Sequence, residues 1–146
     1  DLVQPFLTSD APMGTLKRRI DSDEDLRNPG VVKVTTDREG HALYFSRAPI
    51  PLVRDDPKRS AVPGLHFIHL GLYIYTRETL ARLTALPTGM LEEAEKLEQL
   101  RDLENGIRIR VWETSHASLR IDSPEDVPVA LAQLRAQTSG PGSTQP

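Results

Sequence analysis

The chain has 146 residues, enough for one domain of ordinary size or a large part of a bigger one. Apolar residues make up 38% and charged residues 27%, which excludes disorder along the whole chain. Its 18 basic and 21 acidic side chains give a net charge of -3, which disfavours nucleic-acid binding, and without cysteine it has no disulfide framework or thiolate metal site. No apolar run reaches the ~20 residues of a membrane span and no signal peptide opens the chain, so the sequence predicts a soluble, cytoplasmic protein.

The middle of the chain predicts strands around a long loop. Val31 to Thr36 and Ala42 to Phe45 form a hairpin, because Asp37 to Gly40 carries turn residues. Arg47 to Ser60 is rich in proline and charge, so we expect a loop, and loops of that length are usually functional or disordered. Leu65 to Tyr75 is almost continuously apolar, which predicts a central strand covered on both faces.

Two helices and a strand are expected next. Thr76 to Ala85 reads as a helix that ends before Pro87. Leu91 to Asn105 reads as a single amphipathic helix stopped at Gly106. Ile107 to Trp112 alternates apolar residues with arginine, which indicates a strand with one wet face.

The last segments complete an alternation typical of α/β or α+β domains. Leu119 to Ile121 predicts a short strand, and Ser123 and Pro124 begin a helix through Leu134. Residues 137–146 contain only Gly, Pro, Ser, Thr and Gln, so a disordered tail is expected.

Asp122 is the first candidate for chemistry, because it lies between a predicted strand end and a helix N-cap. An aspartate at the carboxyl end of a strand can hold a divalent cation against phosphate oxygens. The alternative is an ordinary capping aspartate.

Arg47 and Arg54 flank rigid proline backbone, which suits bidentate binding of a carboxylate or phosphate, unless they are simply solvated loop charges. His69 lies inside the apolar strand, either lining a pocket or as a core histidine bonded to backbone. Tyr73 shares its strand face, roughly 13 Å further along an extended strand, so one ligand reaches both only if it is long or the strand bends.

Glu98 and Gln99 follow Leu97 in the second predicted helix, where they are most simply its exposed flank. No catalytic triad order, glycine-rich phosphate loop or metal-ligand spacing of histidines is present. From the residues alone, the chain is an α/β piece with a candidate anion site.

Longer strings add a family resemblance. Asn28 to Val34, Ala42 to Pro51, His69 to Tyr75, Leu97 to Arg101 and Asp122 to Asp126 strongly resemble, in order and spacing, the family of CMP-Kdo synthetases, the 3-deoxy-manno-octulosonate cytidylyltransferases. The likeness extends from Thr15 to Arg135, and the family's glycine-rich CTP loop and Gly-Asp-x-Pro segment lie before the part that it covers. It implies the C-terminal half of a nucleotide-diphospho-sugar transferase (Rossmann-like) fold, a mixed sheet flanked by helices, over residues 1–136.

The resemblance implies transfer of CMP from CTP to Kdo with release of pyrophosphate, for lipopolysaccharide biosynthesis, with Mg²⁺ as cofactor. Asp122 would be the catalytic metal ligand of this half. The sugar-acid pocket would be lined by Arg47, Arg54, His69, Tyr73, Glu98 and Gln99. The hairpin region is a common dimer contact in the family, so a homodimer is expected.

Some positions depart from the family pattern: Ile68 replaces a frequent arginine, Arg120 replaces a small glycine, and the middle of Leu91 to Glu95 differs. A rival substrate is another sugar acid such as sialic acid, although the string from Phe45 to Pro51 favours Kdo. The alternative from another class is a non-catalytic remnant that dimerises or binds a sugar acid. We expect no turnover from this chain without a CTP-binding half.

Overall fold

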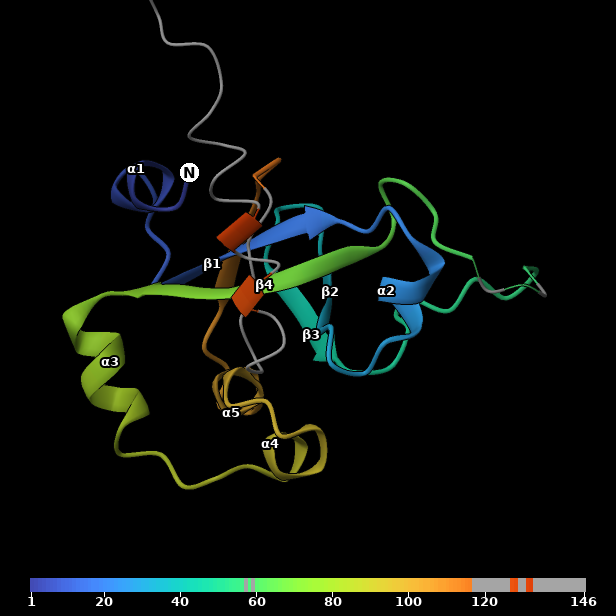
Figure 1. Cartoon of the computed structure of the whole chain (residues 1–146). Coiled ribbons are helices and arrows are strands. Elements are labelled where there is room, and N and C mark those ends of the chain that lie inside the picture. Colours follow the sequence, from blue (N-terminus) through green and yellow to red (C-terminus); the bar gives the residue numbers. More distant parts are fainter. Residues whose placement is uncertain (57, 59, 117–126, 129–130, 133–146) are drawn as a thin grey trace, which may run out of the picture. The chain divides into compact units, whose positions relative to one another are not determined.

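Five strands form one mixed sheet in the described part of this computed structural model, which covers residues 1–56, 58, 60–116, 127–128 and 131–132. The strands are β1 (Met13–Arg19), β2 (Lys33–Thr36), β3 (Ala42–Ser46), β4 (Phe67–Tyr75) and β5 (Ile109–Glu113). Their spatial order is β3-β2-β4-β1-β5; β1 and β5 are parallel and the other neighbours antiparallel. The expected mixed α/β architecture is therefore confirmed (Figure 1).

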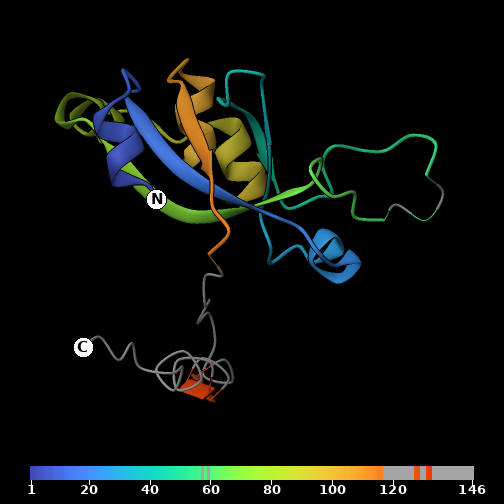
Figure 2. The same ribbon diagram turned by 90° about the horizontal axis from the view of Figure 1, so that it is seen from above.

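The helices are short. They are α1 (Val3–Leu7), α2 (Asp23–Arg27), α3 (Arg77–Leu83), α4 (Met90–Glu95) and α5 (Gln99–Glu104). α5 packs against the sheet with α4 on its outer side, and α1 lies against the opposite face (Figures 1 and 2). The alternation of β5 explains this arrangement: Ile109 and Val111 face α5, whereas Trp112 faces the other way and meets Phe6 of α1 edge-on at 6.4 Å.

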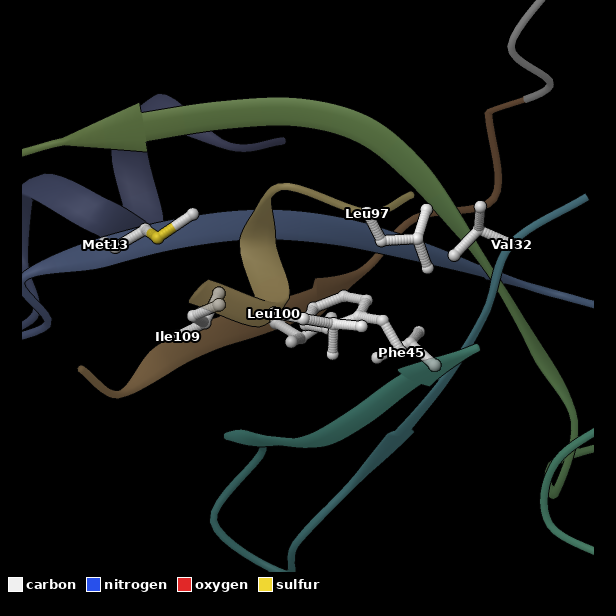
Figure 3. Close-up of a cluster of buried hydrophobic side chains, with 8 residues drawn as sticks. Met13, Val32, Phe45, Leu97, Leu100 and Ile109 are labelled. Atoms are coloured by element: carbon white, nitrogen blue, oxygen red, sulfur yellow. The ribbon is translucent and has the colours of Figure 1, made fainter. Parts of the chain in front are cut away.

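The main core lies between the sheet and α5. Its buried apolar side chains, most of which Figure 3 labels, are Met13, Val32, Val34, Phe45, Leu97, Leu100, Ile109 and Val111. A smaller cluster at the α2 end of the sheet contains Ile20, Leu26, Val31 and Ile68. These two clusters hold β4, the strand that carries the predicted site residues His69 and Tyr73.

Several predicted elements are confirmed. The hairpin is β2 and β3, with Gly40 at φ 81° in its turn. The apolar strand is β4, third of the five strands in the sheet. Thr76 caps α3 through its hydroxyl, and β5 alternates buried apolar residues with arginine as expected.

Two expectations are wrong, and one strand was not predicted. β4 is not covered on both faces, since Leu72 is 54% exposed. The single helix from Leu91 to Asn105 is broken into α4 and α5, because Lys96 adopts a left-handed conformation at φ 52°. The pattern also did not predict β1, whose second half is charged.

The chain divides into two units, 1–116 and 117–146, each described by itself. In the second unit, Val127, Pro128, Leu131 and Ala132 are helical, in agreement with the predicted last helix. The predicted strand at Leu119 to Ile121 and the predicted tail at 137–146 lie outside the described residues. Among the described helices, none has the length and apolar character needed to span a bilayer.

Candidate functional site

A cleft of about 460 Å³ opens where the end of β4 faces α3 and the junction of α4 with α5. α3 supplies an apolar wall with Leu80 and Leu83. The polar and charged lining comprises Tyr73, Tyr75, Thr84, Lys96, Glu98, Gln99, Arg101 and Asp102. The cleft therefore brings together three predicted pocket residues, Tyr73, Glu98 and Gln99.

The strand that carries His69 and Tyr73 is bent between them. Thr15 of β1 pairs with Tyr73 and Lys17 with His69, so β4 advances four residues while β1 advances two. Gly71, at φ 67°, lies in this bulge and takes a conformation that glycine adopts without strain. The two rings consequently lie 5.3 Å apart, far closer than the roughly 13 Å expected for an extended strand.

His69 is buried and held by a side chain on the neighbouring strand. The Thr15 hydroxyl donates to the Leu72 carbonyl at 2.7 Å and lies 2.9 Å from His69 Nε2. Because that hydroxyl has a single hydrogen, Nε2–H of the imidazole is the donor of the second bond. The ring also packs edge-on against Phe45 at 4.8 Å, so His69 is fixed between the core and Tyr73.

The break between α4 and α5 decides where Glu98 and Gln99 point. Lys96 turns the chain, and Glu98 becomes the N-cap residue of a new helix. Glu98 is exposed at the rim, whereas Gln99 is only 6% exposed. The interpretation of both residues as a solvated helix flank is therefore wrong for Gln99.

Burial raises the pKa values of three acidic groups in the cleft. It raises the pKa of the Asp102 carboxyl to about 6, reinforced by Glu92 and Glu98 and opposed by Arg101. Burial likewise raises the pKa of Tyr75 to about 12, and it raises the pKa of Tyr73 further. Both phenols are protonated at neutral pH and can each donate one hydrogen bond to a ligand.

Asp102 was not among the predicted site residues. It lies three residues after Gln99, which places both on one face of α5. That spacing is a signal present in the sequence, although the burial of Asp102 cannot be predicted from it.

Arg47 lies beside the cleft, where it binds backbone. Its guanidinium donates to the carbonyls of Glu95, Pro29 and Lys96 at 2.8, 3.0 and 3.4 Å. The buried ammonium of Lys33 in turn donates to the Arg47 carbonyl at 2.6 Å. The arginine is thus held next to Lys96, while its predicted contact with a substrate carboxylate stays a prediction.

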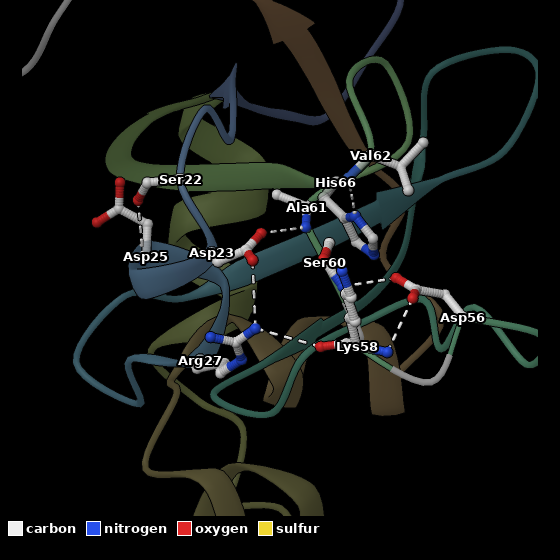
Figure 4. Close-up of polar contacts among 10 residues, drawn as sticks. All are labelled: Ser22, Asp23, Asp25, Arg27, Asp56, Lys58, Ser60, Ala61, Val62 and His66. Atoms are coloured by element: carbon white, nitrogen blue, oxygen red, sulfur yellow. Dashed lines mark hydrogen bonds and ion pairs between the residues drawn. The ribbon is translucent and has the colours of Figure 1, made fainter.

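Arg54 lies exposed in the long loop between β3 and β4, without a hydrogen bond or ion pair to any described residue. The predicted absence of helix and strand from this loop is confirmed in its described part. Figure 4 shows how α2 anchors the loop: the Asp23 carboxylate accepts from the Ala61 amide at 2.8 Å, and Arg27 donates to the Lys58 carbonyl at 3.2 Å. Arg54 therefore extends from a loop whose base is fixed.

Asp122, the predicted metal ligand, lies outside the described residues. Within the described part of the chain, Asp37, Glu39 and His41 are the group whose ligand atoms are close enough to share an ion. That group already holds Arg108, which donates to Glu39 at 3.0 Å and lies 2.8 Å from His41 Nδ1. A second cation would meet the guanidinium charge, so these residues do not fit a magnesium site.

The chain is similar to known proteins in both sequence and fold. The sequence model of the cytidylyltransferase family matches residues 2–109. The chain belongs to the cytidylyltransferase family. Its relatives within that family include the 3-deoxy-manno-octulosonate cytidylyltransferases of Solibacter usitatus and Geobacter sulfurreducens, which are 54% identical over 118 residues and 50% identical over 129 residues.

These alignments cover 81% and 84% of this cytidylyltransferase chain but 45% and 52% of the relatives, so the chain spans about half their length. A solved structure of CMP:2-keto-3-deoxy-manno-octonic acid synthetase complexed with CTP matches with a TM-score of 0.73 at 36% identity. The match covers 89% of this chain and 50% of that one, and it supports the nucleotide-sugar-transferase fold.

Proposed function

We propose that the protein to which this chain contributes transfers CMP from CTP to Kdo and releases pyrophosphate, as a step in lipopolysaccharide biosynthesis in the cytoplasm. The observation that carries the proposal is the cleft in which Tyr73, Glu98 and Gln99 meet, in a chain about 50% identical to Kdo cytidylyltransferases. In this reaction the 2-hydroxyl oxygen of Kdo forms a bond to the α-phosphorus of CTP while the bond to the β-phosphate breaks.

The described residues support a role in holding and orienting the sugar acid. Gln99 offers a buried amide with two donors and an acceptor, Glu98 accepts from hydroxyls, and Tyr73 donates from a protonated phenol. Arg47 and Arg54 are proposed to face the sugar carboxylate, and His69 to orient Tyr73 through ring packing. Such positioning lowers the entropic part of the barrier before any bond changes.

Asp122 is the proposed ligand for Mg²⁺ in this half. When bound, the ion would offset negative charge on the phosphate oxygens. The described residues contribute no competing site, since Arg108 occupies the acidic group of the hairpin.

A homodimer is also proposed, through the hairpin. β3 is an edge strand in the described sheet, and its Leu43 is 62% exposed. An exposed edge with an apolar side chain is suited to pairing with a second copy.

A chimaera tests the proposed activity. The chain would replace the matching half of the Geobacter sulfurreducens relative, and pyrophosphate would be measured with CTP, Mg²⁺ and either Kdo or sialic acid. We expect release with Kdo, little with sialic acid, and none from the isolated chain. A folded chimaera that binds Kdo without turnover would instead favour the sugar-acid-binding module.

A further inference from the structure

The carboxylate of Asp102 has no partner in the part of the chain that the structure describes. The residue is 5% exposed, yet no hydrogen bond or ion pair reaches its side chain from any described residue. Among those residues, Arg18 Nε is the fully enclosed side-chain polar atom without a partner. The unpartnered Asp102 oxygens are therefore not completely buried, and they are accessible from the cleft that the residue lines.

Nearby cations do not account for this carboxylate. Arg101 is adjacent in sequence and also lines the cleft, but its Nε and Nη2 donate to the two carboxylate oxygens of Glu92 at 2.7 and 2.5 Å. Lys96 lines the same cleft, and its ammonium is paired with Glu93. A buried carboxylate without a donor costs stability, so packing and ion pairing within the described residues give no reason for an acid here.

The chemistry of the cleft indicates what the missing partner carries. Asp102 and Glu98 repel an anionic group and accept from donors, while Tyr73, Tyr75 and Gln99 both donate and accept. A ligand with several hydroxyls satisfies this set, whereas a bare carboxylate or phosphate does not. A polyhydroxylated acid would therefore lie with its hydroxyl-bearing part at Asp102 and its carboxylate away from it.

We propose that Asp102 is a further substrate-binding residue, which accepts a hydrogen bond from a hydroxyl of the sugar acid and sets the direction in which that acid enters the cleft. This inference rests on the proposed function, since it takes Kdo as the ligand. It adds to Glu98 and Gln99 a third polar contact from the same face of α5.

Kdo binding to the full chain tests the role of Asp102. Calorimetric titrations would compare the wild type with Asp102→Asn, which keeps the shape of the side chain, and Asp102→Ala, which removes it. Glu24→Gln on α2 is the matched control, because it makes the same chemical change at an exposed site away from the cleft. We expect the Kd for Kdo to rise about tenfold in both Asp102 variants and to stay unchanged in Glu24→Gln.

Thermal unfolding of the same proteins separates a binding role from a structural one. If Asp102 serves the ligand, its replacement by Asn leaves the midpoint unchanged or raises it, and Kdo stabilises this variant less than the wild type. A lowered midpoint, an unchanged Kd or tighter Kdo binding in Asp102→Asn would overturn the proposal while leaving the proposed function standing. Failure of the wild-type chain to bind Kdo would overturn this inference, and the turnover of the chimaera would then decide the proposed function separately.

Discussion

Asp102 lies in α5 between Arg101, whose charge Glu92 balances, and a cleft lined by two tyrosines. Its carboxyl has an ordinary pKa of 3.8, which burial raises to about 6 in the folded chain; Glu92 and Glu98 also raise it and Arg101 lowers it. The folded state therefore binds this proton more tightly than the unfolded state does. Protonation stabilises the fold, and that stabilisation is lost as the pH rises from about 4 to about 6.

We expect Asp102→Asn to remove this pH dependence. Its free energy of unfolding, relative to wild type, should rise by about 2 kcal/mol between pH 4 and pH 7, since a shift of about two pKa units corresponds to about 3 kcal/mol and part of it is already present at pH 4. Urea unfolding at pH 4, 5, 6 and 7 measures the difference, with Glu24→Gln as the control. A difference that stays constant over this range would show that the Asp102 pKa is not raised.

At the scale of an element, the bulge in β4 controls the spacing of site residues. Gly71 adopts φ 67° with no atom within 4 Å of where a Cβ would lie, so a side chain there meets backbone strain but no clash. The same bulge exposes the Leu72 carbonyl to the Thr15 hydroxyl and brings Tyr73 to His69. The contact between the two rings thus depends on one left-handed residue.

Gly71→Ala should lower the free energy of unfolding by about 1 kcal/mol, the usual cost of a left-handed alanine. Gly71→Asn should cost less, because asparagine tolerates this conformation. Chemical denaturation measures both variants. Equal losses in the two would show that backbone strain at Gly71 is not the cause, and that the side chain itself disturbs the sheet.

The elements also show what the sequence could predict. Turn residues identified the hairpin and a continuous apolar run identified β4, whereas β5 was identified by alternation, because it buries every second side chain. β1 was not predicted, because Lys17, Arg18 and Arg19 interrupt its apolar pattern. In the structure Lys17 is nevertheless half-buried and packs its ammonium over Phe67. The break at Lys96 was not predicted, because lysine is not one of the residues, glycine above all, that usually mark a left-handed helix end.

The site residues, like the elements, could be predicted only in part. The resemblance identified Tyr73, Glu98 and Gln99, which one cleft brings together. Asp102 lies just after the resembling string Leu97 to Arg101, and an aspartate in an amphipathic helix is expected to be solvated, whereas Asp102 is buried. Its burial is a property of tertiary packing, which single-sequence patterns do not contain.

At the scale of the whole unit formed by residues 1–116, two separate apolar clusters stabilise the sheet. The larger joins the sheet to α5, and the smaller joins α2 to the sheet near the loop that carries Arg54. Leu26 belongs to the smaller cluster and Leu100 to the larger, and they are 1% and 0% exposed. The two leucines are a matched pair for asking whether the clusters open together.

We expect the two apolar clusters to open separately. Leu→Ala at either position should cost about 2 to 5 kcal/mol locally. Leu26→Ala should speed amide exchange in α2 and in the loop between β3 and β4 while sparing β1 and β5, because α2 anchors that loop through Asp23 and Arg27. Leu100→Ala should speed exchange throughout the sheet. If the same amides exchange faster in both variants, the unit opens cooperatively. The loop that carries Arg54 would then not open independently of the sheet.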